Sequence, residues 1–321
     1  MIDSAFPSYP VDQAILDELF AAFRLERSLW APQTGTDGLC RLQPLNEEHL
    51  PRLATTTFLP LKKVLLPPRE EVWSFDSGHF CAAQEPGPFA VVGVTLCDLQ
   101  AAWYLDQVFA EDLPYQARRA QAFLVGMACE PGPECRCDQK LMPLAGDLFL
   151  SQERVWALSP AGEALLHSCG CRTRQDNLLP WPTEVPGKRH ALTQERFAAA
   201  NDAVVWAEEA KRCLSCGACS AVCPTCYCFD MLDEAALDGS VSRRRVWDNC
   251  FFAEHGKVAG DYDFRPGRAN RLRFRMEHKR FGFGALRGQD SCVGCGRCRM
   301  VCPVDIDLDR IAERLDAEGC S

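Results

Sequence analysis

The sequence lacks the segments that direct export or membrane insertion. Its first residues, MIDSAFPSYPVDQAILDELF, have neither a cationic start nor an apolar core, so we expect no secretory signal. No apolar run reaches the roughly 18 residues that a membrane-spanning helix needs, so no membrane span is expected. These absences predict a cytoplasmic protein, in which cysteines stay reduced and bind metal more often than they form disulfides.

Signatures of nucleotide binding and of nucleophilic catalysis are also missing. Neither a G-x-G-x-x-G nor a Walker sequence occurs, so we expect no nucleotide held by those devices. No nucleophile stands in a pattern with a base, and no catalytic residue is predicted. The histidines are isolated along the chain: His49, His79, His167, His190, His255 and His278. The formal net charge of −9 argues against a general nucleic-acid binder.

Cysteine, by contrast, is abundant, with 20 residues in a chain of 321. Two runs have the spacing C-x2-C-x2-C-x3-C-P, beginning at Cys213 and at Cys292. This spacing is typical of bacterial ferredoxins, in which each run supplies thiolates to 4Fe–4S clusters. A zinc site, the alternative, needs two cysteine pairs and would leave the third cysteine and the Cys-Pro unexplained. The sequence therefore predicts two 4Fe–4S clusters.

The ferredoxin pattern also predicts how the ligands are shared. Three closely spaced cysteines hold one cluster, and the cysteine before proline ligates the other cluster. Gly217 and Gly296 are expected to let the backbone pass close to the sulfur ligands. The predicted ligands are Cys213, Cys216, Cys219 and Cys302 for the first cluster, and Cys292, Cys295, Cys298 and Cys223 for the second.

An insertion, residues 224–291, separates the two runs. Its cysteines Cys226, Cys228 and Cys250 are weak candidates for metal ligands and are otherwise expected to pack in an apolar shell. Residues 265–287 hold eight Lys or Arg against one Glu. We interpret this basic strip as neutralising anionic clusters or docking an acidic subunit rather than as a nucleic-acid surface.

The N-terminal part predicts a small α/β domain. Helical periodicity marks residues 11–27 and 98–113, apolar runs at 89–97 and 122–129 predict buried strands, and residues 146–159 predict two strands around a turn. Strand–helix–strand order favours a largely parallel core. Residues 60–75 predict short strands around a turn, and residues 193–212 and 307–319 predict helices that flank the cysteine runs.

These patterns together predict an α+β protein. It comprises an N-terminal α/β domain (1–168), a linker (169–192) and an α-helical dicluster ferredoxin domain (193–321) with the insertion 224–291.

The predicted N-terminal strands both end in cysteine, at Cys97 and Cys129, and the loop after the second carries Cys135 and Cys137. Strand ends are the usual place for ligands in α/β sheets. Four thiolates also complete the ligand set of one cubane, so these cysteines predict a third 4Fe–4S cluster. The alternative is four buried structural thiols. Cys81, Cys169 and Cys171 remain possible substitutes within the quartet.

Several stretches resemble one family: CPTCYCFD, RVWDNC, RMEHK, VVGVTLCDLQAAWYLDQVF and LVGMACEPGPECRC. Together with the split cysteine runs they resemble the iron–sulfur beta subunit of soluble NiFe hydrogenases (sulfhydrogenases). The corresponding iron–sulfur subunit of anaerobic sulfite reductase and the dicluster subunit of flavin oxidoreductase–heterodisulfide reductase complexes are similar. The resemblance covers roughly residues 89–305 and departs from the family at Thr95-Leu96, where Arg-Pro is expected before Cys97.

The resemblance implies an electron-transfer subunit. Its expected partners are a flavin/NAD(P)-binding subunit on one side and, on the other, a catalytic subunit of hydrogenase, sulfite reductase or heterodisulfide reductase type. Two other functions stay open. The cysteine-lined N-terminal site could itself be catalytic, for example in sulfur reduction. An iron–sulfur regulatory protein would instead bind DNA through the basic strip in a salt-sensitive way. Of these, the sequence favours electron transfer with neither a nucleic-acid partner nor a membrane span.

Overall fold

The computed structural model describes residues 5–45, 54–83, 86–138 and 142–318. Its internal contacts divide the chain into two units. The first unit comprises residues 1–67, 82–131 and 138–185, and the second comprises residues 68–81, 132–137 and 186–321. The second unit therefore draws two short segments from the N-terminal half of the sequence, and each unit is described by itself.

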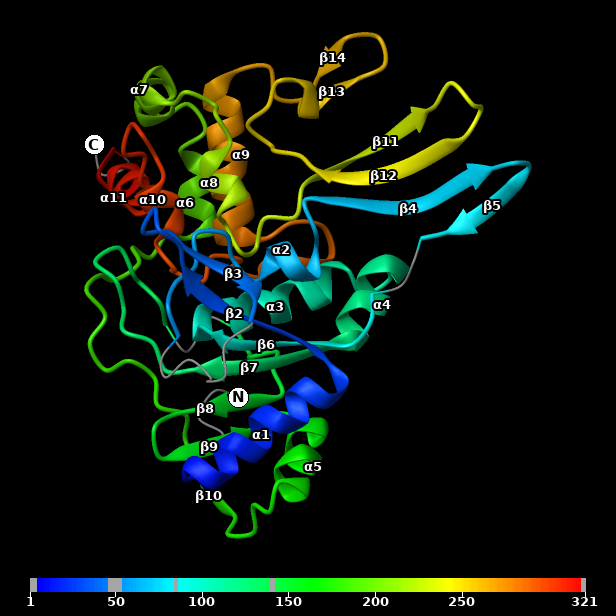
Figure 1. Ribbon diagram of the computed structural model, residues 1–321. Coiled ribbons are helices and arrows are strands. Elements are labelled where there is room, and N and C mark those ends of the chain that lie inside the picture. Colours follow the sequence, from blue (N-terminus) through cyan, green and yellow to red (C-terminus); the bar gives the residue numbers. More distant parts are fainter. Residues whose placement is uncertain (1–4, 46–53, 84–85, 139–141, 319–321) are drawn as a thin grey trace. The chain divides into compact units, whose positions relative to one another are not determined.

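The first unit is built on a mixed sheet of eight strands (Figure 1). Its four central strands, in the order β8-β7-β6-β2, are parallel, as the strand–helix–strand pattern predicts. Antiparallel strands complete both edges. In sheet order the strands are β10 (Gln175–Asn177), β1 (Phe6–Pro10), β9 (Arg154–Ala157), β8 (Leu148–Leu150), β7 (Ala122–Met127), β6 (Phe89–Val94), β2 (Ser28–Thr34) and β3 (Cys40–Pro44).

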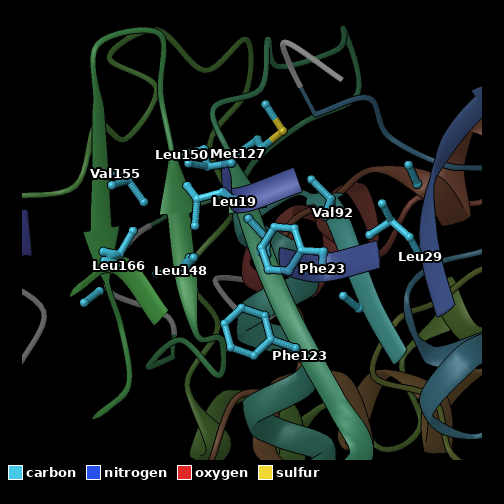
Figure 2. Packing of buried hydrophobic residues seen from close by; sticks show 14 of the residues in the cluster. Leu19, Phe23, Leu29, Val92, Phe123, Met127, Leu148, Leu150, Val155 and Leu166 are labelled. Atoms are coloured by element: carbon cyan, nitrogen blue, oxygen red, sulfur yellow. The ribbon is translucent and has the colours of Figure 1, made fainter. Parts of the chain in front are cut away.

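Helix α1 (Gln13–Glu26) covers one face of this sheet and closes the main apolar core. Figure 2 shows Leu19 and Phe23 of α1 lying against side chains of the strands. The ring centroids of Phe23 and Phe123 are 5.5 Å apart. The remaining helices of the unit are α2 (Lys62–Leu65), α3 (Leu96–Val108), α4 (Leu113–Gln121) and α5 (Pro160–Ser168).

The structure differs from the sequence expectation at the ends of the two buried strands. Strand β6 ends at Val94, and Thr95 caps helix α3 by accepting a hydrogen bond from the Asp98 amide, so Cys97 lies in the first turn of a helix. A Thr is a good N-cap because its hydroxyl satisfies an amide that has no partner within the helix. Strand β7 ends at Met127, two residues before Cys129. The cysteines therefore follow the strands rather than end them.

Other helix boundaries also differ from the prediction. The helix predicted at 98–113 is α3, which ends at Val108. Asp112 then caps the next helix, α4, and Pro114 lies in the first turn of α4. The segment 193–212 is two helices, α6 (Gln194–Ala199) and α7 (Val204–Arg212). Asn201 and Asp202 occupy the break between them, where their side chains favour turns over helix.

The second unit carries the cysteine runs and a smaller apolar core. Its remaining helices are α8 (Ala218–Ala221), α9 (Arg268–Phe281), α10 (Arg297–Met300) and α11 (Leu308–Glu318), with 3-10 turns at η1 (Glu254–Gly256) and η2 (Gly284–Leu286). Helices flank both cysteine runs, as expected. Trp206 of α7, Met276 of α9 and Ile311 of α11 meet in the core of this unit. The core thus joins helices from before, between and after the two runs.

The second unit also contains β-structure that the prediction of a helical module did not include. Two hairpins form a four-stranded antiparallel sheet with the order β11 (Phe229–Ala235), β12 (Val241–Trp247), β4 (Arg69–Asp76) and β5 (His79–Ala82) (Figure 1). A short pair, β13 (Lys257–Val258) and β14 (Tyr262–Asp263), follows in the insertion. The prediction of short strands at residues 60–75 holds for β4, whereas Lys62–Leu65 is the helix α2.

Candidate cluster-binding site

The first cysteine run is shaped by a tight loop between two helices. Helix α7 ends at Arg212 and delivers Cys213 to the loop. Ser215 and Gly217 have positive φ angles of 52° and 75°. A Cβ at Gly217 would also lie 2.4 Å from the amide nitrogen of the Asn249 side chain. Glycine is therefore required at this position by its backbone conformation and by crowding.

A pocket in the second unit brings the first run together with a cysteine far along the chain. It is lined by Cys213, Cys216, Cys219 and Cys302, the four cysteines predicted to share one cluster. Cys298 also lines this pocket. No disulfide joins any two of the cysteines that the structure describes. Within the same ranges, no group of three His, Cys, Asp or Glu side chains is already assembled around a single ion position.

The walls of this pocket are largely apolar, although Cys216 at its edge is exposed. Phe251, Leu272, Ile306 and Leu308 line it with apolar surface. Ser215 also lines it, and the hydroxyl oxygen of Ser215 is buried with no hydrogen-bond partner among the described residues. A buried hydroxyl normally finds a partner. A sulfide or thiolate acceptor in the pocket would satisfy it, so the residues present fit an iron–sulfur group.

The second cysteine run makes a matching loop. Gly294 and Gly296 have positive φ angles of 65° and 74°. A Cβ at Gly294 would lie 2.1 Å from the carbonyl oxygen of Arg136, and one at Gly296 would lie 2.4 Å from that of Glu134. The segment 132–137 therefore packs directly against this cysteine loop, and only glycine permits so close an approach.

The Cys-Pro turn of the first run lies beside the second run. The Thr225 hydroxyl donates a hydrogen bond of 2.6 Å to the carbonyl of Ser291, which immediately precedes Cys292. Burial raises the pKa of Cys298, and the neighbouring thiols of Cys292, Cys295 and Cys223 raise it further. Thr225, two residues after Cys223, therefore lies beside the start of the second run. That Cys223 is a ligand of the second cluster stays a prediction.

Helix α9 places cations between the cysteine loops. Arg275 and Lys279 are 3% and 4% exposed. Arg275 donates to the carbonyl of Cys219, and Lys279 donates to the Thr225 hydroxyl beside Cys223. Arg268, at the start of α9, donates to the carbonyl of Cys213. Three of the eight cations of the basic strip, Arg271, Arg275 and Lys279, are therefore buried within the second unit.

The surplus cysteines of the insertion form thiol pairs. Cys226 is hydrogen-bonded to Cys223, and this bond raises the pKa of Cys226 and lowers that of Cys223. A hydrogen bond from Cys250 lowers the pKa of Cys228 to about 6, and the same bond raises the pKa of Cys250. Cys228 and Cys250 also belong to the apolar core of the second unit. Both the packing role and a ligand role remain compatible with these positions.

The four cysteines predicted to hold a third cluster are divided between the two units. Cys97 and Cys129 belong to the first unit, and Cys135 and Cys137 belong to the second. The thiol of Cys97 lies 3.1 Å from the Thr95 hydroxyl. Cys129 lies against the main apolar core of the first unit. The third cluster stays a prediction.

The three cysteines considered as alternative ligands of the third cluster, Cys81, Cys169 and Cys171, differ in burial. Cys81 is exposed on β5. Cys171 is buried and Cys169 lies against the same core, and burial raises the pKa of both thiols.

Sequence reasoning missed several residues that shape the site. Ser215 and Thr225 stand between the cysteines, but a serine or threonine in a loop carries no distinctive signal. Arg136 lies between Cys135 and Cys137, and its carboxylate partners Asp307 and Asp309 are far along the chain. The basic composition of residues 265–287 was a signal for Arg275 and Lys279, although it did not distinguish inward-facing from exposed cations.

Comparison with known proteins agrees with this geometry. Residues 212–306 match the family described as 4Fe–4S dicluster domain. The chain is 32% identical over 287 residues to Sulfhydrogenase 2 subunit beta of Pyrococcus furiosus, an alignment that covers 81% of this chain and 85% of that protein. No solved structure matches. Among the described residues, no helix has the length and apolar character that crossing a membrane requires.

The dicluster match indicates that the chain binds 4Fe–4S clusters. The relative is a subunit of a hydrogenase, and its alignment extends well beyond the dicluster segment into the first unit. The extent and identity of that alignment, together with the paired cysteine loops, establish that this chain belongs to the family of iron–sulfur beta subunits of sulfhydrogenases.

Proposed function

We propose that the chain relays electrons through two 4Fe–4S clusters, with a flavin/NAD(P)-binding subunit on one side and a catalytic oxidoreductase subunit on the other. The observation that carries this proposal is the pocket in which Cys302 joins Cys213, Cys216 and Cys219. Each cluster, when bound, accepts and releases one electron at a time. A site that only passes electrons needs no substrate-binding groups, which agrees with the absence of a catalytic motif from the sequence.

The residues of the second unit have defined tasks in this proposal. In this proposal Cys302 completes the first site and Cys223 completes the second. Cys302 lines the pocket of the first run, which supports the first assignment, and the hydrogen bond from Thr225 to Ser291 beside Cys292 supports the second. The apolar side chains of Phe251 and Leu272 line the first site and limit its contact with water. Exclusion of water and the nearby charges set the potential of such a site.

The proposed partners follow from the relative's name, which makes it part of a sulfhydrogenase. The catalytic partner is of hydrogenase type, with sulfite reductase and heterodisulfide reductase types as alternatives. A relay of this kind operates only when a donor and an acceptor are both present.

The experiment compares the isolated chain with its complex, purified without oxygen. The isolated chain is expected to be reduced by dithionite but to oxidise neither NADH nor NADPH and to turn over neither hydrogen nor sulfite. Reconstitution with co-purified partners should restore turnover, and Cys302→Ala in the assembled complex should abolish it. Robust turnover by the chain alone would identify it as an enzyme and would contradict the proposal.

A further inference from the structure

Helix α9 carries two cations that are buried rather than exposed. Arg275 and Lys279 are four residues apart, so they lie one turn apart on the same face of the helix. Their exposed fractions are 3% and 4%. Arginine and lysine are almost never fully buried unless an anion or a hydrogen-bond network compensates them. Each therefore needs a specific partner within the second unit.

The guanidinium of Arg275 spans contacts with the first cysteine run and the segment after it. One terminal nitrogen donates to the Ser220 hydroxyl at 2.8 Å and to the Cys226 sulfur at 3.3 Å. The other donates to the carbonyl of Cys219 at 3.1 Å. These contacts fix the charged group against the loop that supplies ligands to the first cluster site.

The charge of Arg275 also acts on the second site. Arg275 lines the same pocket as Cys298, and the Cys226 sulfur that its guanidinium contacts is hydrogen-bonded to Cys223. Cys298 belongs to the second run, and Cys223 is the ligand that the first run is predicted to contribute to the second cluster. One guanidinium therefore lies within electrostatic reach of cysteines assigned to both sites.

Carboxylates do not account for this buried charge. Across residues 5–45, 54–83, 86–138 and 142–318, no Asp or Glu side chain pairs with Arg275. Arg280, on the same helix, is instead paired with Asp309. A buried cation without an anion is strongly unfavourable. The anions available to Arg275 are the cysteine sulfurs, which become thiolates when they hold a cluster.

We propose that Arg275 is a charge-compensating residue shared by the two cluster sites and that it raises the reduction potential of both. The proposal rests on the dicluster relay proposed above. Reduction adds one electron to a site that is already anionic, with no bond formed or broken in the protein. A fixed guanidinium nearby stabilises the more negative, reduced form of a cluster more than the oxidised form. Arg275 therefore acts on the reduction potential through its charge.

The test is a potentiometric titration of the full chain, purified without oxygen and followed by electron paramagnetic resonance. Arg275→Gln removes the charge and keeps a hydrogen-bonding side chain, and Arg275→Lys keeps the charge. Arg273→Gln is the matched control, because Arg273 lies on the same helix and contacts Glu277 and Phe197 instead of the cysteine loops.

At the potential where each wild-type cluster is half reduced, Arg275→Gln should lower the ratio of reduced to oxidised form for both clusters by about tenfold or more. Arg275→Lys and Arg273→Gln should stay close to the wild type. Unchanged potentials in an iron-loaded Arg275→Gln chain would overturn the proposal, as would a shift confined to one cluster or an equal shift in Arg275→Lys.

Cluster loss is also an informative result. If Arg275→Gln loses iron while Arg275→Lys keeps both clusters at wild-type potentials, the charge itself is required and the proposal stands. Loss of iron from both variants would make Arg275 a packing residue and would overturn the assignment. A wild-type chain that lacks two cubane signals would instead contradict the dicluster proposal, so the two failures are distinguishable.

Discussion

Asp307 links the segment 132–137 to the second cysteine run, and its charge can be removed with little change in shape. Its carboxylate accepts two hydrogen bonds from Arg136, at 3.0 and 3.2 Å, and contacts Arg299 at 3.3 Å. It immediately precedes α11 and accepts a bond of 2.8 Å from the Asp309 amide. Although burial opposes ionisation, that amide and Arg136 lower the pKa of Asp307.

Asp307→Asn keeps the helix cap, because Asn is as good an N-cap as Asp. It removes the negative charge that faces Arg136 and Arg299, whose side chains are 20% and 8% exposed. Breaking a fully buried ion pair costs about 3–5 kcal/mol. In this cluster Arg136 retains Asp309 and Arg299 retains Glu134, so we expect a smaller loss of about 2 kcal/mol in the free energy of local opening.

Hydrogen–deuterium exchange of the native, cluster-loaded chain measures this opening directly. The amide of Arg136 is bonded to the carbonyl of Gly294 at 2.7 Å, so peptides that contain residues 132–137 report on the contact. A loss of about 2 kcal/mol predicts roughly 30-fold faster exchange in Asp307→Asn.

The matched control is Asp305→Asn in the same loop. Asp305 is 68% exposed and pairs with the half-exposed Arg310. Its positive φ of 53° also suits Asn. Exposed pairs contribute little, so exchange should change by less than about twofold. Equal exchange in the two variants would refute the claim that Asp307 fastens this segment to the cysteine loop.

Two further predictions concern the ligands and the pH dependence. Under shared ligation Cys302 and Cys213 hold the same cluster, so the double variant Cys302→Ala/Cys213→Ala should lose about four iron atoms. Cys302→Ala/Cys292→Ala removes a ligand from each cluster and should lose about eight. The reverse pattern would show that each run holds its own cluster. Burial, followed by the nearby Lys279 and arginines, lowers the pKa of His278 from 6.5 to about 4. The unfolded chain therefore binds this proton more readily than the folded chain, and the stability of the fold decreases as the pH drops from 6.5 toward 4. In anaerobic urea titrations the free energy of unfolding of the wild type should fall by about 1 kcal/mol more than that of His278→Asn between about pH 8 and pH 6. Identical pH dependence of the two proteins would contradict this assignment.

The cysteine spacing predicted the family correctly, whereas periodicity predicted the bounds of several helices less well. The spacing of the two runs is a local property of the chain, and it matched the family of dicluster domains over residues 212–306. Helix breaks depend on single residues, and periodicity alone missed the cap at Asp112 and the turn at Asn201. Periodicity locates the middle of a helix better than its ends, which are set by single capping residues of this kind.

Long-range pairing was the part that the sequence could not show. Strand β4 joins β12 through contacts between residues about 70 and about 245, and nothing local to either strand identifies the partner. The same holds for Arg136 and Asp307, and for the burial of Arg275 within a strip that reads as uniformly basic. Composition indicated the sign of the charge, and tertiary packing decided which cations face the cysteines.

The central claim is that the two cysteine runs together hold two 4Fe–4S clusters. Iron and acid-labile sulfide, measured per chain after anaerobic purification and compared with the Mössbauer spectrum, test it most directly. About eight iron and eight sulfide with cubane spectra are predicted, and about twelve of each would add the third cluster predicted from Cys97, Cys129, Cys135 and Cys137. About four iron atoms per chain, or zinc in stoichiometric amount, would contradict the account.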